Sequence, residues 1–142
     1  MTDQTDERLL ALLSENARAP VSRLGKALGL SRTTVQGRIE RLERQGVIAG
    51  YTLRLASDYE RGLVKAHVLI TALPKYARQV EKGLRGVANV KTLHSVSGQF
   101  DMIAVVTAST IAELDGVIDR IGEMEGVERT MSSIILSTRF ER

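Results

Sequence analysis

The sequence predicts an α+β fold made of two parts, an N-terminal helix-turn-helix and a C-terminal ferredoxin-like βαββαβ unit. Apolar residues recur at helical spacing in three short segments within the first 50 residues. From about residue 63 onward, segments of strand composition alternate with two helical ones in the order βαββαβ. A faint internal repeat supports that order, because "LRGVANV" (84–90) and "MEGVERT" (124–130) both end a helix with Gly-Val and lead into a strand.

Two helices are expected before residue 30. The segment 3–17 repeats leucines at helical spacing and carries acidic residues at its N-terminal end, where the helix dipole stabilises negative charge. Pro20 suits the first turn of a second helix, whose apolar residues again follow helical spacing. Gly29 is expected to end that helix as a left-handed C-cap.

A third helix is expected directly after the short turn "GLS". Ser31 is a suitable N-cap, and Gly46 follows the last helical residues as a stop. One narrow face of this helix is apolar, and we expect it to pack against the first two helices. The residues of this apolar seam are Val35, Ile39 and Leu42.

After the third expected helix, the sequence pattern changes from helical to strand-like. Residues 47–55, "VIAGYTLRL", are typical of a strand or a short hairpin arm, and the polar residues 57–62 are the best candidate for a domain boundary. We therefore expect a helix-turn-helix domain over 1–50, a connecting strand or linker over 51–62, and a βαββαβ domain over 63–142.

A ferredoxin-like unit places two helices on one face of a four-stranded antiparallel sheet. Val, Ile and Leu run through the expected strands with little alternation, so the second face should also be covered. A second copy of the chain is the simplest cover, which predicts at least a homodimer. The expected strands are 64–73, 89–97, 101–108 and 129–140, and the expected helices are 75–84 and 111–121.

The composition excludes several classes of protein. Without cysteine the chain has no disulfide framework, thiolate metal site or cysteine nucleophile. No apolar run approaches the ~20 residues that cross a bilayer, and the acidic start "MTDQTDERLL" is unlike a signal peptide, so we expect a cytoplasmic protein. Between Arg18 and Arg44, seven basic residues face two acidic ones, a local net charge of +5 that favours a polyanionic partner.

A basic, well-capped helix that follows a short helix and a tight turn is the arrangement of a helix-turn-helix that enters the major groove of DNA. At about 100° per residue, Gly37 lies in the middle of the face opposite the apolar seam. Glycine in a helix costs about 1 kcal/mol relative to alanine, so its presence calls for a reason. A backbone without a side chain at this position would allow a close approach to DNA. The alternative is that an exposed position simply tolerates this cost.

The first turns of this helix are expected to meet base edges or phosphates, and its later arginines the phosphate backbone. The alternative is an ordinary solvated surface, in which Glu40 and Glu43 pair with arginines. The candidate DNA-contacting residues are Ser31, Arg32, Thr33, Thr34, Gln36, Gly37, Arg38, Arg41 and Arg44.

Three stretches resemble the Lrp/AsnC family of transcription regulators, the feast/famine regulators: "DERLLALL" (6–13), "LGLSRTTVQGRIERLERQGVIAGYT" (28–52) and "SVSGQFDMI" (95–103). The resemblance, which runs over nearly the whole chain, implies a winged-helix-like or simple helix-turn-helix, a connecting strand, and a C-terminal RAM domain. In that family the RAM domain dimerises, often assembles further into tetramers or octamers, and commonly binds amino acids between neighbouring dimers. The chain departs from the pattern at Gly37 and by lacking a proline after Ser31.

The resemblance implies an amino-acid effector near the turn that follows the second strand of the sensing domain. Such an effector brings an ammonium, which Asp101 can accept, and a carboxylate, which the backbone amides near Gly98 and Gln99 can meet. Hydroxyl groups of the last strand would complete the site. The alternative is that these residues only build a tight hairpin turn. The candidate effector-binding residues are Ser97, Gly98, Gln99, Phe100, Asp101, Thr130, Ser132 and Ser133.

Two other functions are compatible with this build. Siroheme decarboxylases share this two-domain build, so an enzyme that uses His94 is the main alternative. RNA binding through the sheet is disfavoured, because "NVKTLHSVS" and "DMIAVVTA" contain no aromatic residue on which bases could stack. His94 and His67 are more typical of packed or interface histidines. We expect no enzyme, and no catalytic residue, metal site or cofactor.

Overall fold

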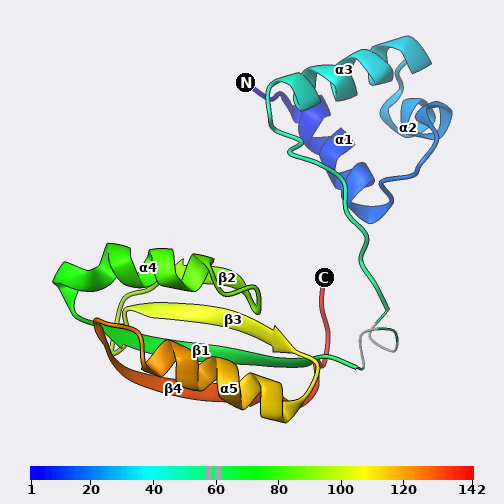
Figure 1. Cartoon of the computed structure of the whole chain (residues 1–142). Helices are drawn as coiled ribbons and strands as arrows, with labels where there is room; N and C mark the ends of the chain where they lie inside the picture. The colour runs from blue at the N-terminus through cyan, green and yellow to red at the C-terminus, as the bar shows by residue number, and fades with distance from the viewer. Residues whose placement is uncertain (57–58, 60–61) are drawn as a thin grey trace. The chain divides into compact units, whose positions relative to one another are not determined.

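The structure, a computed structural model, describes residues 1–56, 59 and 62–142. The chain divides into two compact units, Met1–Arg54 and Leu55–Arg142 (Figure 1). Each unit has a hydrophobic core of its own. The polar boundary expected over 57–62 lies partly outside the described residues.

The N-terminal unit consists of three helices: α1 (Gln4–Glu15), α2 (Val21–Leu28) and α3 (Arg32–Arg44). All three lie where helical periodicity predicts them. The expected apolar seam of α3 is buried, and it packs against one leucine from each of the other helices. The core of the unit is Leu9, Leu24, Val35, Ile39 and Leu42.

The turn between α2 and α3 is tight. Gly29 ends α2 with a φ of 70°, in the left-handed region that favours glycine, as expected. The Leu30 amide donates to the Gly25 carbonyl at 2.9 Å. A Cβ at Gly25 would lie 2.6 Å from the Leu30 carbonyl oxygen, which is closer than carbon and oxygen can approach. The missing side chain of Gly25 is therefore what allows this turn to close.

The strand or hairpin arm expected over 47–55 is wrong. Residues 49–56 have no regular secondary structure, although the alternation in "YTLRL" is typical of a strand. Tyr51, Leu53 and Leu55 are 57%, 82% and 45% exposed. A strand forms only where a neighbour completes its hydrogen bonds, and no other part of the described chain pairs with this segment.

The C-terminal unit is built on a four-stranded antiparallel sheet in the order β2-β3-β1-β4. This is the ferredoxin-like topology that the βαββαβ order predicts, and the expected fold class is confirmed. The strands are β1 (Val64–Ala72), β2 (Val90–Ser95), β3 (Met102–Ala108) and β4 (Val127–Ile135).

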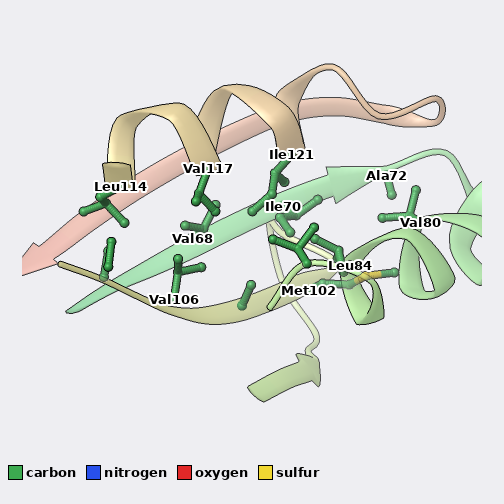
Figure 2. Close-up of a cluster of buried hydrophobic side chains, with 14 residues drawn as sticks. Val68, Ile70, Ala72, Val80, Leu84, Met102, Val106, Leu114, Val117 and Ile121 are labelled. Atoms are coloured by element: carbon green, nitrogen blue, oxygen red, sulfur yellow. The ribbon is translucent and has the colours of Figure 1, made fainter. Parts of the chain in front are cut away.

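Two helices, α4 (Ala77–Arg85) and α5 (Ile111–Gly122), lie on one face of this sheet (Figure 1). Alternate residues of β1 and β3 point toward them and are buried, as Figure 2 shows for the side chains between sheet and helices. The main residues of this core are Val68, Ile70, Ala72, Val80, Leu84, Met102, Val106, Leu114, Val117 and Ile121.

Two element boundaries differ from the sequence-based expectation for a clear structural reason, and others differ by one or two residues. The helix expected over 75–84 starts as a 3-10 turn, Pro74–Tyr76, before α4 begins. The last strand was expected over 129–140, but β4 ends at Ile135, which pairs with Lys65 close to the start of β1. Residues after Ile135 have no partner strand in the described sheet, so the ladder ends there.

The other face of the sheet, called here the open face, is not covered by α4 or α5. Because side chains alternate along a strand, the register assigns each residue to one face. Aliphatic, histidine and hydroxyl side chains lie together on the open face. Its residues are Lys65, His67, Leu69, Thr71, Thr92, His94, Ile103, Val105, Thr107, Arg129, Met131, Ser133 and Ile135.

Candidate functional site

The first turn of α3 is fixed by its cap. Ser31 has an extended backbone, and its hydroxyl accepts from the Thr34 amide at 3.2 Å. The hydroxyl groups of Ser31 and Thr34 also lie 2.8 Å apart, within hydrogen-bond distance. Both residues are exposed, as are Arg32 and Thr33 beside them. The free backbone amides of this turn and the exposed polar side chains thus lie at one end of the helix.

Gly37 lies in the middle of α3 and is exposed. A Cβ at this position would meet no atom within 4 Å, so packing within the chain does not require a glycine here. This contrasts with Gly25, where the neighbouring backbone excludes a side chain. The outward placement inferred from the helical wheel agrees with the structure.

The two acids of α3 have neutral partners. The Gln36 side-chain amide donates to Glu40 at 3.0 Å, and the Tyr51 hydroxyl donates to Glu43 at 3.2 Å. Burial, together with the Glu43 carboxylate, raises the pKa of Tyr51. Within the described chain neither acid forms an ion pair with Arg44, the alternative that helical spacing allowed. Arg44 is exposed and keeps its charge at the surface.

Arg38 and Arg41 are held by acids from the start of α1. Arg38 Nη1 donates to both oxygens of Asp3, at 2.9 and 2.8 Å, and to Asp6 Oδ1 at 2.8 Å. Arg41 Nη2 donates to Asp6 Oδ2. Asp6 is fully buried, while the Asp3 side chain is 54% exposed. These four residues are called here the Asp–Arg cluster.

The Asp–Arg cluster also caps α1. The Asp3 carboxylate accepts from the Asp6 amide at 2.8 Å, and the Asp6 carboxylate accepts from the Asp3 amide at 3.1 Å. The hydrogen bond from Arg38 is the main cause that holds the pKa of Asp3 below its usual range. Burial acts to raise the pKa of Asp6, but Arg38, the Asp3 amide and Arg41 together lower it. Both carboxylates are therefore ionised at neutral pH.

This cluster is not evident from the sequence. Local patterns place the acids at the dipole of α1 and both arginines on DNA phosphate. Asp6 and Arg38 are 32 residues apart, and no local pattern links such positions. The helical wheel does carry one signal. Arg38 lies only about 60° from Val35, which places it beside the apolar seam and not on the outward face. The contact of Arg38 and Arg41 with DNA phosphate stays a prediction.

In the C-terminal unit, the segment 96–101 forms the expected turn between β2 and β3. Gly98 has a φ of 113°, a conformation that favours glycine. The Val96 amide donates to the Asp101 carbonyl at 3.0 Å, and the Asp101 amide donates to the Ile70 carbonyl at 2.9 Å. One oxygen of the Asp101 carboxylate accepts from the Ala72 amide at 2.9 Å. Asp101 thus extends the ladder beyond the end of β3, and the residue as a whole is exposed.

Phe100 reaches across the end of the sheet toward β4. The guanidinium carbon of Arg129 lies 5.5 Å from the centre of the Phe100 ring, a cation–π contact. Arg129 pairs in register with Thr71, whose hydroxyl is buried without a hydrogen-bond partner in the described chain. Arg129 and Thr71 were not in the sequence-based set, because only strand pairing brings them beside the turn.

The hydroxyl groups of β4 are divided between the two faces. Thr130 pairs with Ile70 and Ser132 with Val68, so both lie on the face that carries the helices. Ser133 pairs with His67 on the open face, four residues further along β4 than Arg129. The structure therefore brings Phe100, Asp101 and the preceding turn residues together, but it does not bring Ser132 and Ser133 to that turn.

A cavity of about 510 Å³ lies between α4 and the edge strand β2. Leu84, Leu93 and Met102 contribute to its apolar part, and Arg78, Arg85 and Lys91 are the cations that line it. None of the residues from Ser97 to Asp101 lines it. This cavity is thus separate from the predicted effector turn.

The histidines form no metal site. His67 and His94 both lie on the open face and are exposed, His94 opposite Ile103. Over residues 1–56, 59 and 62–142, no group of three or more His, Asp or Glu side chains could hold a metal ion. No helix in the same residues is long and apolar enough to cross a membrane.

Together, the fold and its surfaces define a class of protein: a helix-turn-helix unit with an exposed basic helix, joined to a ferredoxin-like α+β unit. Family models agree over both units. An AsnC-type helix-turn-helix domain matches residues 3–43, and an Lrp/AsnC ligand binding domain matches residues 65–142. The chain belongs to the Lrp/AsnC family of transcriptional regulators.

Individual relatives extend over nearly the whole chain. It is 30% identical to the HTH-type transcriptional regulator LysM of Saccharolobus solfataricus, covering 97% of this chain and 96% of the relative. It is 34% identical to the HTH-type transcriptional regulator LrpA of Pyrococcus horikoshii, covering 96% and 97%. Among solved structures, the feast or famine regulatory protein of M. tuberculosis complexed with L-methionine matches with a TM-score of 0.86, 33% identity, and coverage of 98% and 95%.

Proposed function

We propose that this protein is a sequence-specific DNA-binding regulator that reads its operator with the outward face of α3. The observation that carries the proposal is the exposed polar and basic surface around Gly37, on a helix whose opposite side is buried in the core. The proposed DNA-contacting residues are Ser31, Arg32, Thr33, Thr34, Gln36, Gly37 and Arg44. Arg38 and Arg41 lie at the flank of this surface.

We propose further that the regulator acts as at least a homodimer formed through the open face. Leu69, Ile103 and Val105 are only partly buried there, and Met131 is 54% exposed. A second copy would cover these aliphatic side chains, as sheet faces of this composition require. Two copies would present two α3 helices to half-sites one or more helical turns apart, so the operator should be an imperfect palindrome. Assembly into tetramers or octamers is part of the proposal.

The segment 49–56 supports the same assembly. Tyr51, Leu53 and Leu55 alternate as in a half-buried strand and are exposed in the single chain. Pairing with the same segment of a second copy would supply the hydrogen bonds that the single chain lacks. A dimer thus accounts for both a sheet face and a strand-like segment.

We propose an amino acid as the effector, bound at the turn that carries Phe100 and Asp101. The exposed Asp101 carboxylate can accept an ammonium through the oxygen that the Ala72 amide does not contact. Arg129 and the unpaired Thr71 hydroxyl lie at the same end of the sheet and can meet a carboxylate. The relative complexed with L-methionine supports this ligand class. A binding role is favoured over an enzymatic one, because the relatives are named regulators and His94 lies exposed against aliphatic Ile103.

The experiment is an electrophoretic mobility shift with duplexes selected from genomic fragments, repeated with each of the twenty amino acids. We expect one set of duplexes to be retained over random DNA, and one amino acid to change the midpoint. Retention without any amino-acid effect would refute the effector and leave the DNA proposal. Absence of selective retention, with a visible absorption band on adding siroheme, would instead favour the enzymatic alternative.

A further inference from the structure

Three arginines of α3 succeed one another at intervals of three residues, yet they differ in surroundings. On a wheel of about 100° per residue, Arg38, Arg41 and Arg44 lie roughly 60°, 120° and 180° from Val35. The Arg38 side chain is 23% exposed and that of Arg41 37%. Arg44 lies on the outward face with Thr33 and Gly37. Only one of the three therefore projects fully away from the unit.

The other two are neutralised within the protein. The Asp–Arg cluster holds two carboxylates and two guanidinium groups, so it adds no net charge to the surface of α3. All three oxygens that Arg38 Nη1 contacts belong to these carboxylates. Arg41 Nε is buried and has no hydrogen-bond partner among the residues described, so this part of the guanidinium is turned away from solvent.

Release of these arginines toward DNA would be unfavourable. Asp6 is fully buried, and a buried carboxylate that loses a counter-charge and a hydrogen bond is strongly destabilised. A DNA phosphate could replace the carboxylates on Arg38 only by leaving Asp6 with Arg41 alone. The contacts of the Asp–Arg cluster thus favour the intramolecular partners.

We propose that Asp3 and Asp6 occupy Arg38 and Arg41 in place of DNA phosphates, and so limit the charge-driven, non-specific affinity of α3 for DNA. Asp3 and Asp6 are then specificity-determining residues that do not themselves touch DNA. The phosphate contacts of the helix come from the outward cations, Arg32 and Arg44. This inference rests on the proposed DNA-binding role of α3.

The test uses two charge-neutral double variants of the full chain. Asp3→Asn with Arg38→Gln removes one charge of each sign within the cluster and keeps a good N-cap, since asparagine caps helices as well as aspartate. Glu7→Gln with Arg44→Gln makes the same change of charge outside it, because Glu7 is exposed in the first turn of α1. Affinity for a random-sequence duplex is measured by fluorescence anisotropy from 50 to 200 mM salt.

Each phosphate contact contributes about 0.9 to the slope of log affinity against log salt, or about 3.5-fold over this fourfold salt range. We expect the cluster variant to keep the wild-type slope and the Arg44 variant to lose about 0.9. A loss of about 0.9 in the cluster variant would overturn the inference and leave DNA binding in place. If wild type does not bind DNA at all, the proposed function and the inference fail together.

A single substitution covers the case in which the cluster double variant does not fold. Asp3→Asn alone keeps both arginines and the cap, and Glu7→Gln is its control for the gain of one positive charge. We expect Asp3→Asn to bind random DNA about threefold or more tightly than Glu7→Gln at 50 mM salt, because Arg38 is then partly freed. Equal affinity of the two variants would overturn the inference.

Discussion

Alanine in place of each of two helical glycines should change stability in opposite directions. Gly37 lies inside α3, and its added Cβ would meet no atom within 4 Å. The substitution Gly37→Ala therefore gains the helix propensity of alanine, about 1 kcal/mol, at no steric cost. For a domain of this size that gain corresponds to a rise in Tm of about 4–8 °C.

Gly25→Ala is the matched control. It offers the same gain in propensity, but its Cβ would lie 2.6 Å from the Leu30 carbonyl oxygen. The backbone of the turn would have to move, and overpacking of this kind costs about 1–3 kcal/mol. We expect a net loss of stability for Gly25→Ala in the N-terminal unit.

Scanning calorimetry of the full chain measures both effects. A rise for Gly37→Ala with a fall for Gly25→Ala is the expected pair of results. A fall for Gly37→Ala would refute the placement of this residue on an open surface. The operator affinity of Gly37→Ala then tests the role of the glycine in DNA binding. If the added methyl group keeps the helix from the groove, we expect this affinity to weaken by about tenfold, a difference of about 1.4 kcal/mol. Unchanged affinity would show that the helix only tolerates the glycine.

Three further predictions concern acid stability, assembly and the effector turn. The folded pKa values of Asp3 and Asp6 lie below the ordinary 3.8, so their stabilisation is present above about pH 4 and lost as the pH falls through the lowered values. The Tm of the N-terminal unit should thus fall less steeply between pH 5 and 2 in Asp3→Asn than in wild type, and equal slopes would contradict this. Met131→Asp on the open face should shift the chain to monomer in sedimentation, whereas Ala112→Asp on exposed α5 should not; a dimeric Met131→Asp would argue against the open-face interface. Asp101→Ala should cost the C-terminal unit about 1 kcal/mol because the buried Ala72 amide loses its acceptor, and Asp101→Asn less, while calorimetric titration should find amino-acid binding lost in both. Retained binding in either variant would show that Asp101 only builds the turn.

The helices and strands were predictable where a local pattern repeats. The leucines of α1 and the seam of α3 repeat with the helical period that burial imposes, and β1 and β3 are rich in the Val, Ile and Leu of buried strands. The prediction of a strand over 47–55 was wrong for a physical reason, because alternation alone does not form a strand without a partner. The predicted C-terminal end of β4 was wrong for a similar reason. That end is set by the length of its partner strand β1 and not by the composition of β4.

The candidate site was predictable only in part. The exposed face of α3 follows from spacing along one helix, and the turn at Gly98 follows from residue type. The partners of Arg38 and Arg41 come from another helix, and Arg129 and Thr71 reach the turn through strand pairing. Contacts of this kind join residues that are distant along the chain, so they depend on tertiary structure and leave no local pattern in a single sequence.

We propose above that the outward face of α3 reads a specific operator. Selection of bound duplexes from a random pool, followed by sequencing, tests it most directly when wild type is compared with Thr33→Ala, an exposed position beside the cap. We expect wild type to enrich an imperfect palindrome, and Thr33→Ala to relax the preference at particular bases in both half-sites. A pool in which wild type enriches no sequence would contradict it.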